Sequence, residues 1–398
     1  MHSSSEAGGA PLIDIPLVDT DAHVSEPADL WTSRMPAKFA DHAPRPVWVE
    51  EHGEDWWQVG DTLIECVSRH AFAGHDEFPP SYPKSLADAD PASYDAKARL
   101  ERMDGYGLYA QTLYPNIIAF STLEFMKLGD EFAFAAIRAW NDFLAEWTEP
   151  DPNRLIPLMM LPFWNIEDSV AEMTRAKELG HRGIVFAAHT ERGGFPPIWD
   201  DHWNPIYGAA QEMGLSINFH VGNLMPSAKA HQEHWQRPID DNTAVTSQYM
   251  MNNAAAVADV ACKGVCHKFP NLNFVSVESG VGWIPYLMEN LDWHWKNYGG
   301  HLAYPDRELP SFYIRRQVYG TFWFETDTAR HAAELIPDNI MFETDFPHMT
   351  SLSPGPVSPA RAPREMVQDT VKDLDIATVR KIFYENAARV YNLPPLTA

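Results

Sequence analysis

Five ionisable side chains of the kinds that bind metal ions follow short apolar segments of this 398-residue chain. They are Asp21, His23, His220, Glu278 and Asp345. Asp21 and His23 are two residues apart, so on a strand both side chains point to the same side. Imidazole and carboxylate groups gathered in one place are typical of a metal site, because a divalent cation removes the repulsion between the carboxylates.

Each of these residues also has an ordinary structural interpretation. A histidine at a strand end is usually a hydrogen-bonded polar residue, and an aspartate there often caps the next helix. The metal site is favoured because such groups follow four of the eight predicted strands. His348 lies three residues after Asp345 and is a sixth candidate ligand, or else a residue that orients a ligand.

Eight short apolar segments alternate with helical patterns, and this alternation predicts a parallel sheet. They lie at residues 15–19, 109–114, 155–161, 183–186, 215–220, 272–278, 318–324 and 340–345. The chain has no Gly-x-Gly-x-x-Gly turn, which favours an α/β fold of the closed (β/α)8 TIM-barrel type over an open dinucleotide-binding sheet. In such a barrel the C-terminal strand ends converge on one face, where active sites form.

The domain organisation follows from this pattern. Residues 1–14 are predicted to be a disordered tail, and residues 15–398 a single metal-dependent barrel domain. Residues 27–95 contain a predicted hairpin and a stretch rich in Pro and Asp, and they form a long insertion after the first strand. Long loops of this kind are usually functional, so the insertion is predicted to cap the site. Two long helices are predicted over residues 244–268 and 374–390.

Four segments of the chain resemble the amidohydrolase superfamily. They are residues 19–23 (DTDAH), 219–220 (FH), 278–285 (ESGVGWIP) and 344–348 (TDFPH). More narrowly, they resemble the amidohydrolase-related branch that contains aminocarboxymuconate-semialdehyde decarboxylase. The resemblance implies metal ligands at Asp21, His23, His220 and Asp345. Asp21 stands where the family has a histidine, and Glu278 stands where its decarboxylases usually have a catalytic or ligating histidine.

These two departures make the site rich in carboxylates, and such a site suits iron or manganese. The chain thereby resembles a small group of nonheme diiron monooxygenases on the same barrel, of the α-aminoisobutyrate hydroxylase and platensimycin-pathway hydroxylase type. This interpretation implies an oxidoreductase in which two iron ions reduce O2 to hydroxylate a small organic or natural-product substrate. Trp48, Trp56 and Trp57 of the insertion would exclude water.

The alternative is a hydrolase or decarboxylase of an organic acid with one Zn or Mn ion. There the metal polarises a carbonyl or carboxylate group, and Glu278 or Asp345 carries the proton. His220 is the third candidate catalytic residue. A catalytically inactive barrel is a further alternative. The number of carboxylates favours the diiron monooxygenase.

Four residues are predicted to contact the substrate. They are His189, Trp283, Phe346 and His231. His189 follows the fourth strand and could reach the mouth of the barrel. His231 lies in the loop after the fifth strand, where polar neighbours also fit a solvated turn. Trp283 also fits the start of the next helix.

The composition restricts the partners and the location. A net charge of −25 repels a phosphate backbone, so nucleic acid is not an expected partner. No apolar run is long enough for a membrane span, and the start of the chain does not read as a signal peptide. Three cysteines fit a reducing cytoplasmic setting. The expected partners are a small-molecule substrate and O2, and the resemblance implies a homodimer.

Overall fold

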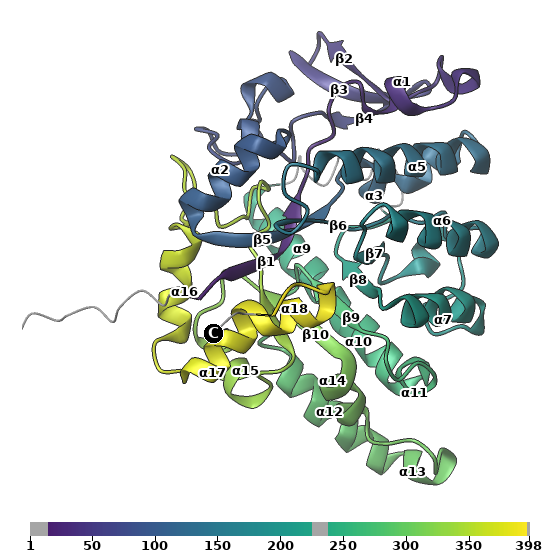
Figure 1. Cartoon of the computed structure of the whole chain (residues 1–398), viewed down its shortest axis with the longest axis vertical. Coiled ribbons are helices and arrows are strands. Elements are labelled where there is room, and N and C mark those ends of the chain that lie inside the picture. The colour runs from purple at the N-terminus through teal and green to yellow at the C-terminus, as the bar shows by residue number, and fades with distance from the viewer. Residues whose placement is uncertain (1–14, 225–237, 396–398) are drawn as a thin grey trace, which may run out of the picture.

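The computed structural model describes residues 15–224 and 238–395. The predicted tail at residues 1–14 lies outside the described residues. Eight strands form one sheet in which every pairing of neighbouring strands is parallel (Figure 1). They are β1 Leu17–His23, β5 Leu108–Tyr114, β6 Leu155–Pro157, β7 Gly183–Phe186, β8 Ser216–His220, β9 Phe274–Val277, β10 Val318–Phe322 and β11 Ile340–Phe342. Each one lies within or overlaps a predicted strand.

The sheet closes into a barrel. Its strand order is β6-β5-β1-β11-β10-β9-β8-β7, and a parallel bridge joins Met159, just after β6, to Ile184 of β7. The backbone N–H of Met159 donates to the carbonyl of Gly183 at 2.9 Å, and the N–H of Val185 donates to the carbonyl of Met159 at 2.9 Å. The predicted α/β barrel is therefore confirmed, and the chain's site residues can converge at one end of it.

Helices surround the sheet (Figure 1). The longer ones are α2 Ala96–Tyr106, α5 Asp130–Trp147, α6 Ile166–Glu178, α7 Asn204–Met213, α9 Ile239–Met250, α10 Asn252–Cys262, α12 Ile284–Asn297, α14 Pro310–Gln317, α15 Asp327–Leu335, α16 Pro363–Val371 and α18 Asn386–Tyr391. The shorter ones are α1 Leu30–Arg34, α3 Ile117–Phe120, α4 Thr122–Met126, α11 Val265–Lys268, α13 Gly300–Ala303 and α17 Ile376–Arg380.

Local chemistry explains the form of these helices. In α5, Asp130 and Glu131 stand in the first turn, where negative charge is stabilised, and one face buries Trp140 and its neighbours. The predicted helix over 244–268 is instead divided into α9, α10 and α11, and Gly264 takes a left-handed conformation at the second break. The predicted helix over 374–390 contains a π turn between α17 and α18.

The segment after β1 forms a small separate sheet on the barrel, seen in purple in Figure 1. Its antiparallel strands are β2 Arg45–Val49, β3 Glu54–Val59 and β4 Thr62–Cys66. The indole rings of Trp31 and Trp57 meet edge to face with centroids 5.1 Å apart. Trp31 also donates a hydrogen bond of 3.2 Å to the carbonyl of Ala136 in α5. The buried Trp31 therefore links this segment to α5 of the barrel.

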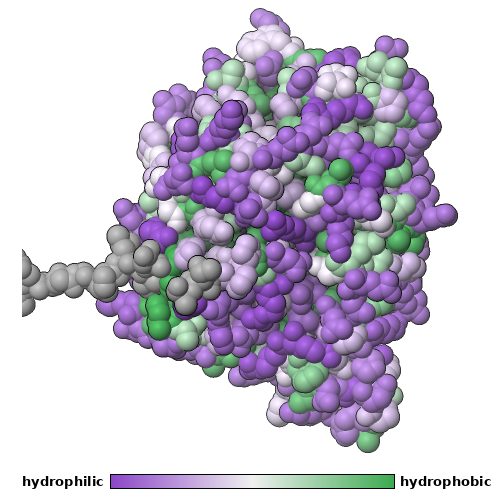
Figure 2. Space-filling model, in the orientation of Figure 1, coloured by the Kyte–Doolittle hydropathy of each residue, from purple (hydrophilic) through white to green (hydrophobic). Residues whose placement is uncertain are grey.

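The outer surface is mostly hydrophilic on the face that Figure 2 shows, with small, separated apolar areas. Among the described residues, none of the helices combines the length and the apolar character that a membrane crossing requires.

Candidate metal centre

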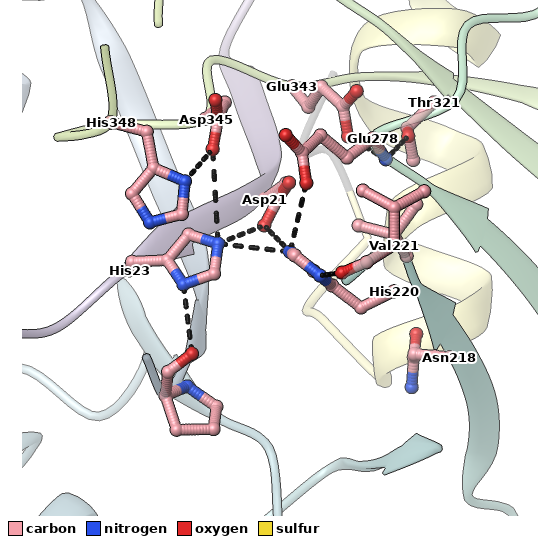
Figure 3. Close-up of polar contacts among 12 residues, drawn as sticks. Asp21, His23, Asn218, His220, Val221, Glu278, Thr321, Glu343, Asp345 and His348 are labelled. Atoms are coloured by element: carbon pink, nitrogen blue, oxygen red, sulfur yellow. Dashed lines mark hydrogen bonds and ion pairs between the residues drawn. The ribbon is translucent and has the colours of Figure 1, made fainter. Parts of the chain in front are cut away.

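The five predicted metal-binding residues and His348 come together at the C-terminal ends of the barrel strands (Figure 3). Their candidate ligand atoms form three overlapping groups, within each of which the atoms lie no more than 4.8 Å apart. The groups are Asp21, His23 and His220; His23, Asp345 and His348; and Asp21, Glu278 and Asp345.

The imidazole rings of His23 and His220 face each other through their Nε2 atoms, which carry no hydrogen. The Nδ1 of His23 lies 3.0 Å from the carbonyl oxygen of Pro115, and the Nδ1 of His220 lies 2.6 Å from that of Val221. Because a carbonyl only accepts, both Nδ1 atoms carry hydrogen in the neutral rings, and both Nε2 atoms are bare. The two Nε2 atoms are 3.0 Å apart. Opposed lone pairs at this distance repel unless a cation binds both.

The carboxylate of Asp21 has no hydrogen-bonding partner in the part of the chain that the structure describes. Asp21 is fully buried, and neither of its carboxylate oxygens is hydrogen-bonded. Its Oδ1 lies 3.5 Å from the Nε2 of His23 and 3.6 Å from the Nε2 of His220. Burial, followed by the charges of Asp345 and Glu278, raises the pKa of Asp21 well above its usual value. A buried carboxylate without a donor is costly, and a bound cation would remove that cost.

Two carboxylates of the cluster are held on strained backbone. Asp345 has a φ of 59° and Glu278 a φ of 55°, a region that residues other than glycine seldom adopt. The Oδ1 of Asp345 has no hydrogen bond to any described residue and lies 3.9 Å from the Nε2 of His23. Its Oδ2 accepts a hydrogen bond of 3.0 Å from Thr350. Burial raises the pKa of both carboxyl groups. Strain of this kind is typical of functional sites.

Glu343, which was not among the predicted site residues, supports the position of Glu278. The backbone N–H of Glu278 donates to Glu343 Oε2 and to Thr321 Oγ1, both at 3.2 Å. Glu343 is fully buried, and burial followed by the charge of Asp21 raises its pKa well above the usual value. The only signal in the sequence was an acidic residue directly after an apolar strand.

His348 lies beside the cluster in a fixed orientation. Its Nε2 is 2.8 Å from the Oδ1 of Asn116, whose Nδ2 donates to the carbonyl of Val24 at 3.3 Å. The Nε2 of His348 therefore carries hydrogen, and its bare Nδ1 faces the Oδ1 of Asp345 at 2.8 Å. Burial and then the charge of His220 lower the pKa of His348 to about 3, so the ring is neutral.

A cavity of about 650 Å³ borders the cluster. Among the described cluster residues, Glu278 and His348 line it, whereas Asp21, His23, His220 and Asp345 do not. The segment after β1 contributes Arg69, His70 and Tyr82 to the wall. The cluster is therefore shielded from the cavity except through one carboxyl group and one imidazole ring.

Arg69 and His70 line the cavity and were not among the predicted site residues. Arg69 is 8% exposed, and its Nε and Nη1 atoms have no hydrogen-bond partner among the described residues, although Nη1 lies 3.9 Å from the Oε2 of Glu65. Its guanidinium lies 5.3 Å from the ring centre of Tyr82. The Nε2 of His70 lies 3.1 Å from the Oε1 of the buried Glu65. No periodic pattern in the sequence points to these two residues, because they lie in an irregular segment that packs on the barrel.

Three of the four residues predicted to contact the substrate lie in the described part of the chain, and they lie away from the cavity. The Nε2 of His189 lies 3.1 Å from the carbonyl of Asn252. The indole of Trp283 donates to the carbonyl of Ser279 at 2.9 Å. Phe346 is 1% exposed. None of the three lines the cavity, and His231 lies outside the described residues. The apolar residue after a strand end, Phe346, packs inward instead of facing the mouth.

Comparison with known proteins gives a family match over most of the chain. The Amidohydro_2 model, described as Amidohydrolase, matches residues 18–393. A gamma-resorcylate decarboxylase from Polaromonas sp. (strain JS666) is 27% identical over 265 residues, which cover 63% of this chain and 76% of that protein.

Solved structures share the fold. An amidohydrolase from Mycobacterium avium subsp. paratuberculosis K-10 has a TM-score of 0.72 and 20% identity, over 95% of this chain and 98% of that one. A 5-carboxyvanillate decarboxylase from Sphingomonas paucimobilis has a TM-score of 0.64 and 18% identity, over 96% and 100%. A dihydroxybenzoic acid decarboxylase from Polaromonas sp. JS666 with bound manganese has a TM-score of 0.61 and 19% identity, over 95% and 97%.

These comparisons correct one prediction. The nonheme diiron monooxygenase, with two iron ions and O2, is wrong, because the curated relative is a decarboxylase and the manganese-bound neighbour is one too. The number of carboxylates does not distinguish the two metals, since a donor set rich in oxygen suits manganese as well as iron. The comparisons favour the alternative prediction with one Zn or Mn ion.

Proposed function

Because this chain belongs to the amidohydrolase family, we propose that it is a decarboxylase of a hydroxyaryl carboxylic acid that uses one Mn or Zn ion. The observation that carries the metal dependence is the pair of bare Nε2 atoms of His23 and His220, 3.0 Å apart. The decarboxylase relative supports the reaction class. The cavity beside the cluster supplies room for a substrate.

The cation would be held by Asp21, His23, His220 and Asp345. Their side chains are buried, face one another and offer two bare nitrogens and three carboxylate oxygens without hydrogen bonds. This mixed set suits manganese, and it also fits zinc. When bound, the cation supplies Lewis-acid polarisation of a substrate oxygen and offsets the negative charge of the site.

Glu278 would supply the proton. Among the described residues that line the cavity it is the only carboxyl group, and its Oε2 lies 3.6 Å from the Nε2 of His220. In the reaction the bond between the ring carbon and the carboxylate breaks, CO2 leaves, and the ring carbon takes a proton. A carboxyl group in the wall beside the cluster can deliver that proton to the ring carbon.

Arg69 would bind an anionic oxygen of the substrate. Among the described residues no hydrogen-bond acceptor is within reach of its Nε and Nη1 hydrogens, and the Oε2 of Glu65 lies 3.9 Å from Nη1, too far for a hydrogen bond. A guanidinium with unused donors in a cavity wall is suited to a carboxylate or phenolate group. The stacking of Arg69 on Tyr82 would hold it in place.

The proposal is tested by incubating protein loaded with manganese with 2,6-dihydroxybenzoate and related hydroxyaryl acids, and measuring the CO2 released. We expect release that depends on the metal and stops when the protein is stripped by a chelator. Hydrolysis of aryl esters or amides, without release of CO2 from any acid, would support a hydrolase instead.

A further inference from the structure

The cavity beside the cluster is large for a one-ring acid. Its volume of about 650 Å³ lies within the range of roughly 300–1,000 Å³ that is typical of sites for drug-sized ligands. Its walls are mostly apolar. A single hydroxylated ring at the metal end would leave much of this apolar surface in contact with water, which is unfavourable.

The orientation of a substrate in the cavity is set by the position of the cluster. Glu278 and His348 belong both to the cluster and to the wall, so they mark the reactive end. The ring that carries the carboxylate must lie at this end. Phe120 lies here too, with its ring centre 6.3 Å from that of His348 and 5.9 Å from that of His220. It provides an aromatic surface for the first ring.

Helix α9 forms a second part of the wall. Asn242, Thr246, Tyr249 and Met250 are half-buried and line the cavity, and their spacing places them on one face of the helix. This face offers an amide, a hydroxyl, a phenol and a thioether. It can pack against a ring and also hydrogen-bond to a polar substituent.

Contacts within the protein already hold the part of the cavity wall formed by Trp323 and the segment after β11. The indole of Trp323 is 3% exposed and donates a hydrogen bond of 3.1 Å to the carbonyl of Thr350. Leu352 is 3% exposed and Met349 is packed against a small apolar cluster. Both residues line the cavity. A ligand would bury apolar surface here without first ordering the wall.

We infer that the substrate is an aryl carboxylic acid with more than one ring, or with an apolar substituent of similar size. Its carboxylate-bearing ring lies at Glu278 and Phe120, and its second ring lies between α9 and Trp323. This inference rests on the proposed decarboxylase function and names its substrate class.

The test compares two acids that share the same reacting group. Full-length protein loaded with manganese is titrated with 2,6-dihydroxybenzoate and with 1,3-dihydroxy-2-naphthoate, in which two hydroxyls also flank the carboxylate. Calorimetry gives the dissociation constants, and CO2 release is recorded in parallel. We expect the naphthoate to bind at least about tenfold more tightly, because its second ring buries more apolar surface.

The outcomes separate the two proposals. The inference would be overturned if the one-ring acid bound as tightly as the naphthoate, or if the naphthoate did not bind. In either case, CO2 release from the one-ring acid would still support decarboxylation. Tighter binding of the naphthoate without CO2 release from either acid would uphold the size of the ligand and count against decarboxylation.

A matched pair of variants on α9 tests the position of the second ring. Thr246→Phe fills part of the cavity, whereas Gln248→Phe adds the same ring on the exposed side of the helix, away from the cavity. We expect Thr246→Phe to weaken binding of the naphthoate about tenfold more than that of the one-ring acid, and Gln248→Phe to change neither. An equal loss for both acids in Thr246→Phe, with an unchanged unfolding temperature, would contradict this placement.

Discussion

The Nε2 atoms of His23 and His220 lie 3.0 Å apart, and neither carries a hydrogen to place between them. The carbonyl groups of Pro115 and Val221 hold the hydrogens on the opposite side of each ring. With the unpaired carboxylate of Asp21 beside them, the two rings form a site that is complete only with a cation.

Metal binding should stabilise the protein, and Asp21→Asn should abolish this effect. At a manganese concentration 100 times the Kd, the free energy of unfolding should rise by about 2.7 kcal/mol. Asp21→Asn should also make the metal-free protein more stable near neutral pH, because it removes a buried carboxyl group with a raised pKa. Thermal unfolding with and without manganese measures both effects. A manganese-induced shift that persists in Asp21→Asn would show that Asp21 is not a ligand.

The metal-free protein should lose stability as the pH rises. Burial raises the pKa of Asp21, Glu278 and Asp345 in the folded state and lowers that of His23 and His348, so the two effects oppose each other below the usual histidine pKa of about 6.5. Above that pH only the carboxyl groups still bind extra protons in the folded state, and stability should fall with increasing pH. Chemical denaturation between pH 6.5 and 8 measures this, and the slope should diminish with saturating manganese. Stability that increased over this interval in the metal-free protein would count against the cluster as described.

Glu26 should make a separate contribution to this pH dependence. Burial raises its pKa from 4.5 to about 7, although its Oε1 accepts a hydrogen bond of 2.9 Å from the backbone of Asn116. Its contribution to stability is complete below pH 4.5 and is lost as the pH rises towards 7. Glu26→Gln should reduce the loss of stability over this interval by about 3 kcal/mol. Equal slopes for wild type and variant would show that Glu26 does not titrate in this range.

Glu278→Gln should reduce CO2 release by roughly 100-fold or more, which is the usual effect of removing a general acid. The manganese content should stay near that of the wild type, because the proposal assigns cation binding to other residues. Metal analysis and kcat measurements on the same preparation test this together. Loss of manganese from the variant would mean that Glu278 acts chiefly as a ligand.

Arg69→Met should weaken substrate binding by roughly 10- to 100-fold, the usual value of a charge-assisted hydrogen bond. Met keeps much of the apolar stem over Tyr82 and removes the charge. The effect should appear in KM more than in kcat, and Arg69→Lys should restore part of it. A variant with wild-type KM for every acid tested would exclude Arg69 from substrate binding.

The barrel could be predicted because its signals are local. Each apolar segment overlaps a strand, and residues 183–186 have one with the same bounds. The acidic and imidazole groups at strand ends must converge once the sheet is parallel. Asp21, His23, His220, Glu278 and Asp345 were found for this reason. The sequence could not show which of them face the cavity, since that depends on backbone such as the left-handed conformation at Glu278.

The cavity wall could not be predicted, because most of it comes from irregular segments. Arg69 and His70 lie in a stretch with no periodicity, and only the packing of that stretch on the barrel brings them to the site. Phe346, which was predicted to contact the substrate, does not line the cavity. It follows a strand end, as a substrate contact would, but its ring lies under the guanidinium of Arg99 at 4.6 Å.

The orientation of both histidine rings is set by main-chain carbonyls, and every amino acid has one. Val221 also lines the cavity, so its side chain and its carbonyl serve different tasks. Position 221 can therefore be varied to retune which ligands are accepted, while His220 keeps its tautomer. Substrate specificity can therefore change through substitutions at this position, next to the reactive end of the cavity, while the metal centre is retained.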